Sequence, residues 1–241
     1  MPTRADIFLV EHGFAVSRAE AQAAIHAGNV RAGGEPVTKP SQLIEEGAEI
    51  VYAKAHPYVS RGALKLVAAL DHFALSPEGV ACLDIGASTG GFTQVLLERG
   101  ARKVYAVDVG HGQMRAMLAS DPRVVSLEGT DARRLSEKVV PEPPQAIVAD
   151  VSFISLKLVL KPALALAKGA WLVALVKPQF EAGRENVGRG GIVKDDAAQT
   201  AAVEAVTRWL EEQDWPVLGT LESPIAGGDG NREFLVAARQ K

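Results

Sequence analysis

The stretch CLDIGASTGGFT, residues 82–93, decides the fold. It reads as a buried strand through Ile85, a tight turn that holds three glycines, and the start of a helix. A ligand at such a turn would lie beyond the carboxyl end of the strand and near the amino terminus of the helix. That is the usual binding crevice of an open α/β sheet.

Strand and helix patterns alternate on both sides of this stretch, which predicts an α/β fold. The pattern favours a Rossmann-like, mostly parallel sheet with helices on both faces. Strands are expected at 80–85, 103–108, 123–127, 145–150 and 170–177 and as two terminal strands, and helices at 60–74, from about 91, from about 112, at 155–167 and at 195–212.

The amino-terminal segment has a different pattern. Helical periodicity over residues 4–27 breaks at Gly13, which predicts two short helices, and short β-prone pieces follow over residues 29–53. The segment KAHPYVSRG, residues 54–62, then interrupts the pattern. We therefore expect a small α+β domain over residues 1–55 and a larger domain over residues 56–241.

Composition limits the classes of protein. The chain has 241 residues of which 47% are hydrophobic, enough for a well-filled core. The sequence has no run of roughly 18 apolar residues and no apolar leader, and its single cysteine, Cys82, excludes an internal disulfide. These features favour a cytoplasmic protein without a membrane segment and without a cysteine-cluster metal site.

The glycine turn does not match two common phosphate-binding motifs. A dinucleotide fingerprint needs G-x-G-x-x-G, but here Gly86, Ser88 and Gly91 occupy the three positions. A phosphate loop needs lysine after its last glycine, whereas Phe92 follows Gly91.

Three acidic residues favour S-adenosylmethionine instead. Asp108 ends the second strand, where a carboxylate accepts the hydroxyls of a ribose. Asp84 would repel a pyrophosphate but attract an ammonium or sulfonium group. Asp131, just past the third strand, would bind the adenine amino group.

Five ordered motifs, YVSRGALKL, LDIGASTGGFT, VDVGHGQ, DVSFISL and LVKPQFE, together resemble the TlyA family, the hemolysin A-like RNA methyltransferases. The catalytic domain of that family is of the FtsJ ribose methyltransferase type, and residues 1 to about 55 resemble its S4 RNA-binding domain. The resemblance implies methyl transfer from S-adenosylmethionine to a ribose 2′-hydroxyl, with cytidine as target, in ribosomal RNA or a ribosomal subunit.

The resemblance also implies site residues. The catalytic tetrad falls on Lys65, Asp150, Lys177 and Glu233. The expected cofactor contacts are Asp84, Gly86, Ala87, Ser88, Gly90, Gly91, Phe92, Asp108 and Asp131. The expected RNA contacts are Arg4, Arg18, Arg31 and Arg61.

The chemistry agrees with these residue types. A 2′-hydroxyl is a weak acid, so it must be aligned with the methyl carbon and relieved of its proton as the bond forms. Lys177 ends a strand beside Asp150 and can accept that proton as a neutral amine. Glu181 competes with Glu233 as the fourth member of the tetrad, although its loop position suits shaping the loop or touching substrate.

Other functions remain as alternatives. An NAD-dependent oxidoreductase is disfavoured by the glycine spacing, and a pore-forming or membrane-active hemolysin is disfavoured by the absence of a membrane-active segment. Residues 1–56 hold five Arg and Lys against seven Asp and Glu, so RNA binding there requires the cations to gather on one face. The glycine-rich loop 183–191, which includes Arg184, suits a flap that orders on RNA.

Overall fold

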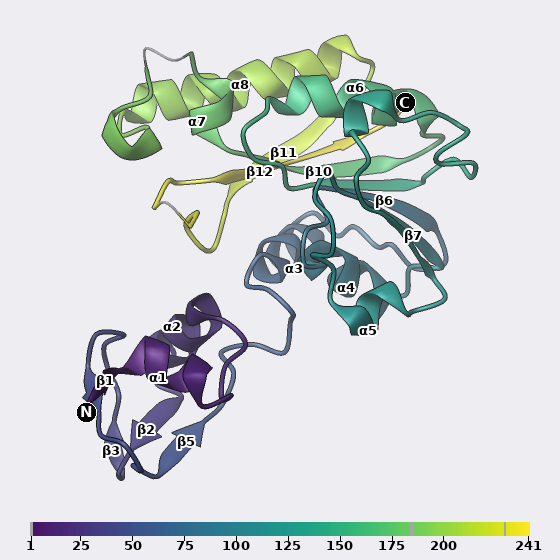
Figure 1. Ribbon diagram of the computed structural model, residues 1–241. Helices are drawn as coiled ribbons and strands as arrows, with labels where there is room; N and C mark the ends of the chain where they lie inside the picture. Colours follow the sequence, from purple (N-terminus) through teal and green to yellow (C-terminus); the bar gives the residue numbers. More distant parts are fainter. Residues whose placement is uncertain (1, 184–185, 229) are drawn as a thin grey trace. The chain divides into compact units, whose positions relative to one another are not determined.

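A seven-stranded sheet organises the larger of the two units of the chain, Tyr58–Lys241. Figure 1 shows the computed structural model, which describes residues 2–183, 186–228 and 230–241. The strands are β6 (Ala81–Ile85), β7 (Lys103–Val107), β8 (Val124–Leu127), β9 (Ala146–Ala149), β10 (Trp171–Val176), β11 (Val217–Glu222) and β12 (Phe234–Arg239).

The strand order is β11-β12-β10-β9-β6-β7-β8. All neighbours from β10 to β8 are parallel, and only β12 runs antiparallel to its neighbours β10 and β11. The predicted α/β class with a mostly parallel sheet is confirmed.

Burial explains why these segments form strands. The runs of β6, β9 and β10 are continuously apolar apart from Asp84 and are buried along their whole length, as expected of central parallel strands. At the sheet edge, β11 alternates between half-buried and exposed residues, because one of its faces meets water.

Helices cover both faces of the sheet (Figure 1). One face packs on α3 (Ala63–His72), α4 (Gly91–Glu98) and α5 (Ala116–Ala119) through a core that includes Leu66, Leu96 and Leu118. The other face packs on α6 (Leu156–Leu166) and α8 (Asp196–Glu212) through a core that includes Leu160 and Val206. Short helices connect these layers: η1 (Ala132–Arg134), α7 (Pro178–Glu181) and η3 (Arg189–Gly191).

One helix starts later than predicted. The segment before α5 forms a turn because the carboxylate of Glu128 accepts the backbone N–H groups of Gly112, Gln113 and Met114 at 2.7, 2.9 and 3.2 Å. These contacts hold the segment away from helical geometry, so the helix expected from about residue 112 begins only at Ala116.

The smaller unit, Met1–Pro57, has its own core around Phe8, Leu9 and Ile25. Its elements are β1 (Thr3–Arg4), α1 (Ala5–Glu11), α2 (Arg18–His26), β2 (Val30–Ala32), β3 (Glu35–Pro36), β4 (Leu43–Ile44) and β5 (Ile50–Tyr52). The two short helices are as predicted, except that Arg4 pairs with β4 as part of a strand. In neither unit does any described helix have the length and apolar character that a membrane crossing needs.

Candidate active site

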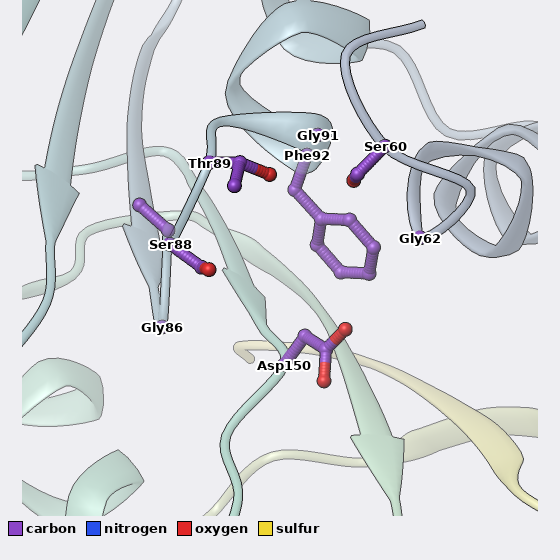
Figure 2. A pocket seen from close by; sticks show the side chains of 9 residues that line it. Ser60, Gly62, Gly86, Ser88, Thr89, Gly91, Phe92 and Asp150 are labelled. Atoms are coloured by element: carbon purple, nitrogen blue, oxygen red, sulfur yellow. The ribbon is translucent and has the colours of Figure 1, made fainter. Parts of the chain in front are cut away.

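Two cavities open at the carboxyl ends of β6 and β9, where the strand order reverses. The smaller has a volume of about 160 Å³ and the larger about 490 Å³. Gly86, Ser88 and Asp150 line both cavities, so the two form one continuous site around the glycine turn. Figure 2 shows the smaller cavity, which is lined in addition by Ser60, Gly62, Ala87, Thr89, Gly91 and Phe92.

Glycine is required at two positions of the turn. Gly86 has a φ of 83°, and a Cβ atom there would lie 2.2 Å from the carbonyl oxygen of Asp150. A Cβ atom on Gly91 would lie 2.3 Å from Oγ of Ser60, the side chain beside it in Figure 2. The turn therefore fits closely against the loop after β9 and the segment before α3. Gly90, with a φ of 96°, precedes the first residue of α4.

Asp108 is fixed in the larger cavity by two backbone groups. Its Oδ2 accepts the N–H of Ser88 at 2.8 Å and its Oδ1 accepts the N–H of Gly110 at 2.7 Å. Each carboxylate oxygen keeps a further lone pair for a ligand hydroxyl. Ser88 reaches this position with a φ of 47°, in the left-handed region that glycine normally occupies.

Asp131 also lines the larger cavity, but its carboxylate is already engaged. Arg133 donates to both of its oxygens, with the shortest contact at 2.7 Å. This hydrogen bond lowers the pKa of Asp131 to about 2. A ligand amine at Asp131 would have to share the carboxylate with Arg133.

Asp84 is fully buried beneath the turn. Thr93 donates its hydroxyl to Oδ2 of Asp84 at 2.6 Å, while Oδ1 accepts no hydrogen bond from the residues that the structure describes. Burial raises the pKa of Asp84 to about 7, and the charges of Asp150 and Asp108 add to the effect. Asp84 lines neither cavity, so the structure does not place this predicted cofactor contact at the surface of the site.

The predicted tetrad forms two ion pairs. Lys65 of α3 pairs with Glu233, and both side chains are buried. Nζ of Lys177 lies 2.7 Å from Oδ1 of Asp150 and 2.9 Å from Oγ of Ser152.

The sheet brings the two ion pairs to the same end of its central strands. In the antiparallel pairing of β10 with β12, Val176 faces Phe234, and the next residues in this register are Lys177 and Glu233. On the other side, β10 is the parallel neighbour of β9, which leads into Asp150.

Glu181 does not pair with either lysine of the tetrad. Its carboxylate instead accepts the hydroxyl of Ser155 at 2.7 Å and the N–H of Leu156 at 2.6 Å. Glu233 is therefore the carboxylate that faces Lys65, and Glu181 contacts the start of α6.

In the smaller unit, Arg4 and Arg18 converge on one buried carboxylate. Asp6 accepts from Nε of Arg4 at 3.1 Å, from Nη2 of Arg18 at 2.7 Å and from Gln22 at 2.8 Å. Burial raises the pKa of Asp6, but these three donors outweigh it and hold the pKa well below its ordinary value. Arg31 is held elsewhere, by the carbonyl oxygen of Gly34.

Arg61 belongs to the larger unit, where it is exposed. Its guanidinium group lies close to Gly228. Its Nη2 atom is 3.4 Å from the position that a Cβ atom on that glycine would take. Of the predicted loop 183–191, Arg184 lies outside the described residues.

The residues of the site that sequence reasoning missed include Ser60, Ser152 and Phe153. Ser60 lines the smaller cavity, and Ser152 hydrogen-bonds Lys177. Phe153 lines the larger cavity, is 90% exposed and has a φ of 66°, which is rare for an aromatic residue. The sequence carried no signal for Phe153, because a single apolar residue at the surface is common and needs no partner.

Comparisons with known proteins match both units. The family model described as FtsJ-like methyltransferase matches residues 58–240, and the S4 domain model matches residues 3–50. The 16S/23S rRNA (cytidine-2′-O)-methyltransferase TlyA of Mycobacterium tuberculosis is 46% identical over 98% of this chain and 89% of its own length.

Two further relatives carry hemolysin names. Hemolysin A of Brachyspira hyodysenteriae is 40% identical over 96% of this chain and 98% of its own length. The solved structure of a candidate hemolysin from Streptococcus thermophilus is 42% identical, with a TM-score of 0.79 over 100% of this chain and 89% of that chain.

Proposed function

The chain belongs to the FtsJ-like methyltransferases, and from that premise we propose that it transfers a methyl group from S-adenosylmethionine to a ribose 2′-hydroxyl of ribosomal RNA. The name of the Mycobacterium tuberculosis relative supports cytidine as the target nucleoside. The S4 match over residues 3–50 supports RNA as the partner of the smaller unit. A ribosomal substrate supports the cytoplasm as the place where the enzyme acts.

The observation that carries the proposal is the ion pair of Lys177 with Asp150, a residue that lines both cavities. S-adenosylmethionine, when bound, supplies an electrophilic methyl group on a sulfonium sulfur. Lys177 would accept the proton of the 2′-hydroxyl as the ribose oxygen bonds to the methyl carbon and the bond between that carbon and the sulfonium sulfur breaks. Asp150 and Ser152 fix the position of Nζ at 2.7 and 2.9 Å, so the amine does not have to be ordered during the reaction.

The residues present fit this cofactor. Asp108 offers two anchored carboxylate oxygens to the ribose hydroxyls, in the larger cavity. Asp84 is fully buried beneath the turn and lines neither cavity, so its carboxyl group can act on a cationic ligand only through its charge at a distance. The smaller cavity, with the Ser60 hydroxyl, suits the amino-acid end of the cofactor.

Two features suit RNA. Arg4 and Arg18 are held together by Asp6 yet remain 42% and 57% exposed, so both guanidinium groups can reach phosphates. Phe153 presents an exposed ring at the larger cavity, and an aromatic face of this kind stacks on a nucleobase that has left its helix.

Methyl transfer by Lys177 variants tests the proposal. With tritiated S-adenosylmethionine and ribosomal subunits, Lys177→Ala should lower the rate by about 10²- to 10⁴-fold, the usual worth of a positioned base. Lys177→Arg should be nearly as inactive, because arginine keeps the charge but cannot accept a proton. Both variants should retain cofactor affinity.

Lys168→Ala is the matched control, since Lys168 is exposed at the opposite end of β10. It should leave the rate unchanged. Near-normal transfer by Lys177→Ala would remove Lys177 from the reaction.

A further inference from the structure

Two loops of the site run side by side and are joined at three levels. The first loop follows β9 and includes residues 150–156, and the second follows β10 and includes residues 177–181. Nζ of Lys177 contacts Asp150 and Ser152, and the rings of Phe180 and Phe153 lie 5.2 Å apart. Glu181 makes the third link between the two loops.

Glu181 connects α7 directly to the start of α6. Its Oε2 accepts the hydroxyl of Ser155, the residue that caps α6, and its Oε1 accepts the N–H of Leu156. A carboxylate at this point satisfies a free N–H group of the first turn and interacts favourably with the helix dipole. The two bonds fix both oxygens of Glu181, so its side chain has a single geometry.

Glu181 is half-buried, and a partly desolvated carboxylate is stable only where hydrogen bonds offset the loss of water. Burial raises the pKa of Glu181, although the bonds from Leu156 and Ser155 oppose the effect. The strained backbone beside these two hydrogen bonds indicates what they hold in place. Phe153 has a φ of 66° and its ring is 90% exposed. Such a conformation persists only where the surrounding contacts fix the backbone on both sides.

The contacts around Phe153 meet that requirement. On its amino-terminal side, Ser152 is hydrogen-bonded to Lys177. On its carboxyl-terminal side, Ser155 and Leu156 are hydrogen-bonded to Glu181. Removing Glu181 would release one side of the loop while leaving the ion pair of Lys177 with Asp150 in place.

We propose that Glu181 is a positioning residue for the RNA substrate, which clamps the loop after β9 so that Phe153 is presented to the target base. This inference rests on the proposed function. It assigns Glu181 to substrate alignment and not to proton transfer, and it assigns no cofactor contact to Glu181.

Steady-state kinetics on the full chain test the inference. Glu181→Ala loses both hydrogen bonds, and the KM for RNA should rise about 10-fold, the value that corresponds to loss of one or two such bonds. The kcat should change less than the KM, and affinity for S-adenosylhomocysteine should be unchanged. Glu181→Gln should keep the wild-type KM, because its amide can accept the hydrogen bond from the N–H of Leu156 and donate one to the hydroxyl of Ser155.

A double-mutant cycle identifies the route of the effect. If Glu181 acts through Phe153, then Glu181→Ala should have no further effect on KM in a Phe153→Ala background. Glu204→Ala, on the exposed face of α8, is the control for loss of a carboxylate and should match wild type. If Glu181→Ala does not fold, Glu181→Asp replaces it, because the shorter side chain cannot make both bonds.

Three outcomes would overturn the inference. Inactivity of Glu181→Gln equal to that of Glu181→Ala would make Glu181 an acid or base of the reaction. Additive effects in the cycle, or an unchanged KM in Glu181→Ala, would separate it from Phe153. Each of these outcomes requires that the wild-type protein methylates the RNA. A wild-type protein without methyl transfer would instead contradict the proposed function.

Discussion

At the residue scale, the protonation of Asp84 links the site to the stability of the larger unit. Burial raises its pKa to about 7 from an ordinary value of 3.8, so between these values the folded protein binds more protons than the unfolded chain. The stability that the folded protein gains by keeping this proton is fully present below the ordinary pKa, and it is lost as the pH rises through about 7. The buried carboxylate therefore destabilises the ligand-free protein above neutral pH.

We predict that the free energy of unfolding falls by up to about 4 kcal/mol between pH 4 and pH 8 through this group, at about 1.4 kcal/mol for each unit of pKa. Asp84→Asn should flatten that part of the curve. Urea unfolding followed by tryptophan fluorescence reports on the larger unit, because Trp171, Trp209 and Trp215 all lie there. Parallel pH curves for the two proteins would contradict the assignment.

Asp108 carries the second prediction at this scale. Asp108→Ala should weaken S-adenosylhomocysteine binding by roughly 1.5 to 3 kcal/mol, the range for hydrogen bonds to a charged partner. The matched control is Asp121→Ala, which removes a carboxylate paired with Arg123 outside both cavities. Calorimetry should show no change for the control and no binding of NAD to wild type. Equal affinities in the two variants would place the ribose elsewhere.

At the element scale, the glycine turn is the most constrained segment of the site. Gly86→Ala would force a Cβ atom to within 2.2 Å of the backbone of Asp150 at a φ of 83°. Gly79→Ala is a matched control, because Gly79 has a φ of 71° but nothing within 4 Å of the added atom. The control should cost about 1 kcal/mol from left-handed strain alone.

Gly86→Ala should cost more than this control in urea unfolding and should also lose cofactor binding, since the clash displaces the loop that carries Asp150 and Phe153. Equal stability of the two variants, with cofactor affinity retained by Gly86→Ala, would show that the turn tolerates a side chain.

The central strands β6, β9 and β10 could be predicted because they are nearly continuous apolar runs. The missed features depend on distant residues. The helix expected from about 112 is shortened by the carboxylate of Glu128, which follows it by more than a dozen positions. Lys65 and Glu233 are 168 positions apart, so only the family resemblance could link them before the structure.

The contacts between the two loops could not be predicted from the sequence for a related reason. The bond from Ser155 to Glu181 joins two loops that meet only because β9 and β10 are neighbours in the sheet. The sequence singled out Glu181, four residues after Lys177, but nothing in it indicated Ser155 as its partner.

At the scale of the whole molecule, we predict that the larger unit alone binds the cofactor and that the smaller unit contributes to RNA binding. Both cavities are lined by residues of the larger unit only, while Arg4 and Arg18 lie in the smaller unit. Removing residues 1–57 should leave the affinity for S-adenosylhomocysteine intact. The affinity for ribosomal RNA should fall and should depend less steeply on salt, because fewer phosphates are neutralised.

Calorimetry and filter binding over a range of salt concentrations check this division. The Arg4→Ala, Arg18→Ala double variant of the full chain should reproduce part of the loss. Methylation by the truncated protein with the efficiency of the full chain would deny the smaller unit a role in RNA binding.

The central claim concerns the atom that receives the methyl group. The most direct measurement maps 2′-O-methylation in ribosomal RNA from cells with and without this protein, using the resistance of methylated positions to alkaline hydrolysis. We predict at least one cytidine whose linkage resists alkali only when the protein is present, and whose resistance is absent when the Lys177→Ala variant replaces the protein. A methyl group found on a base, or identical ribose methylation in both cells, would contradict it.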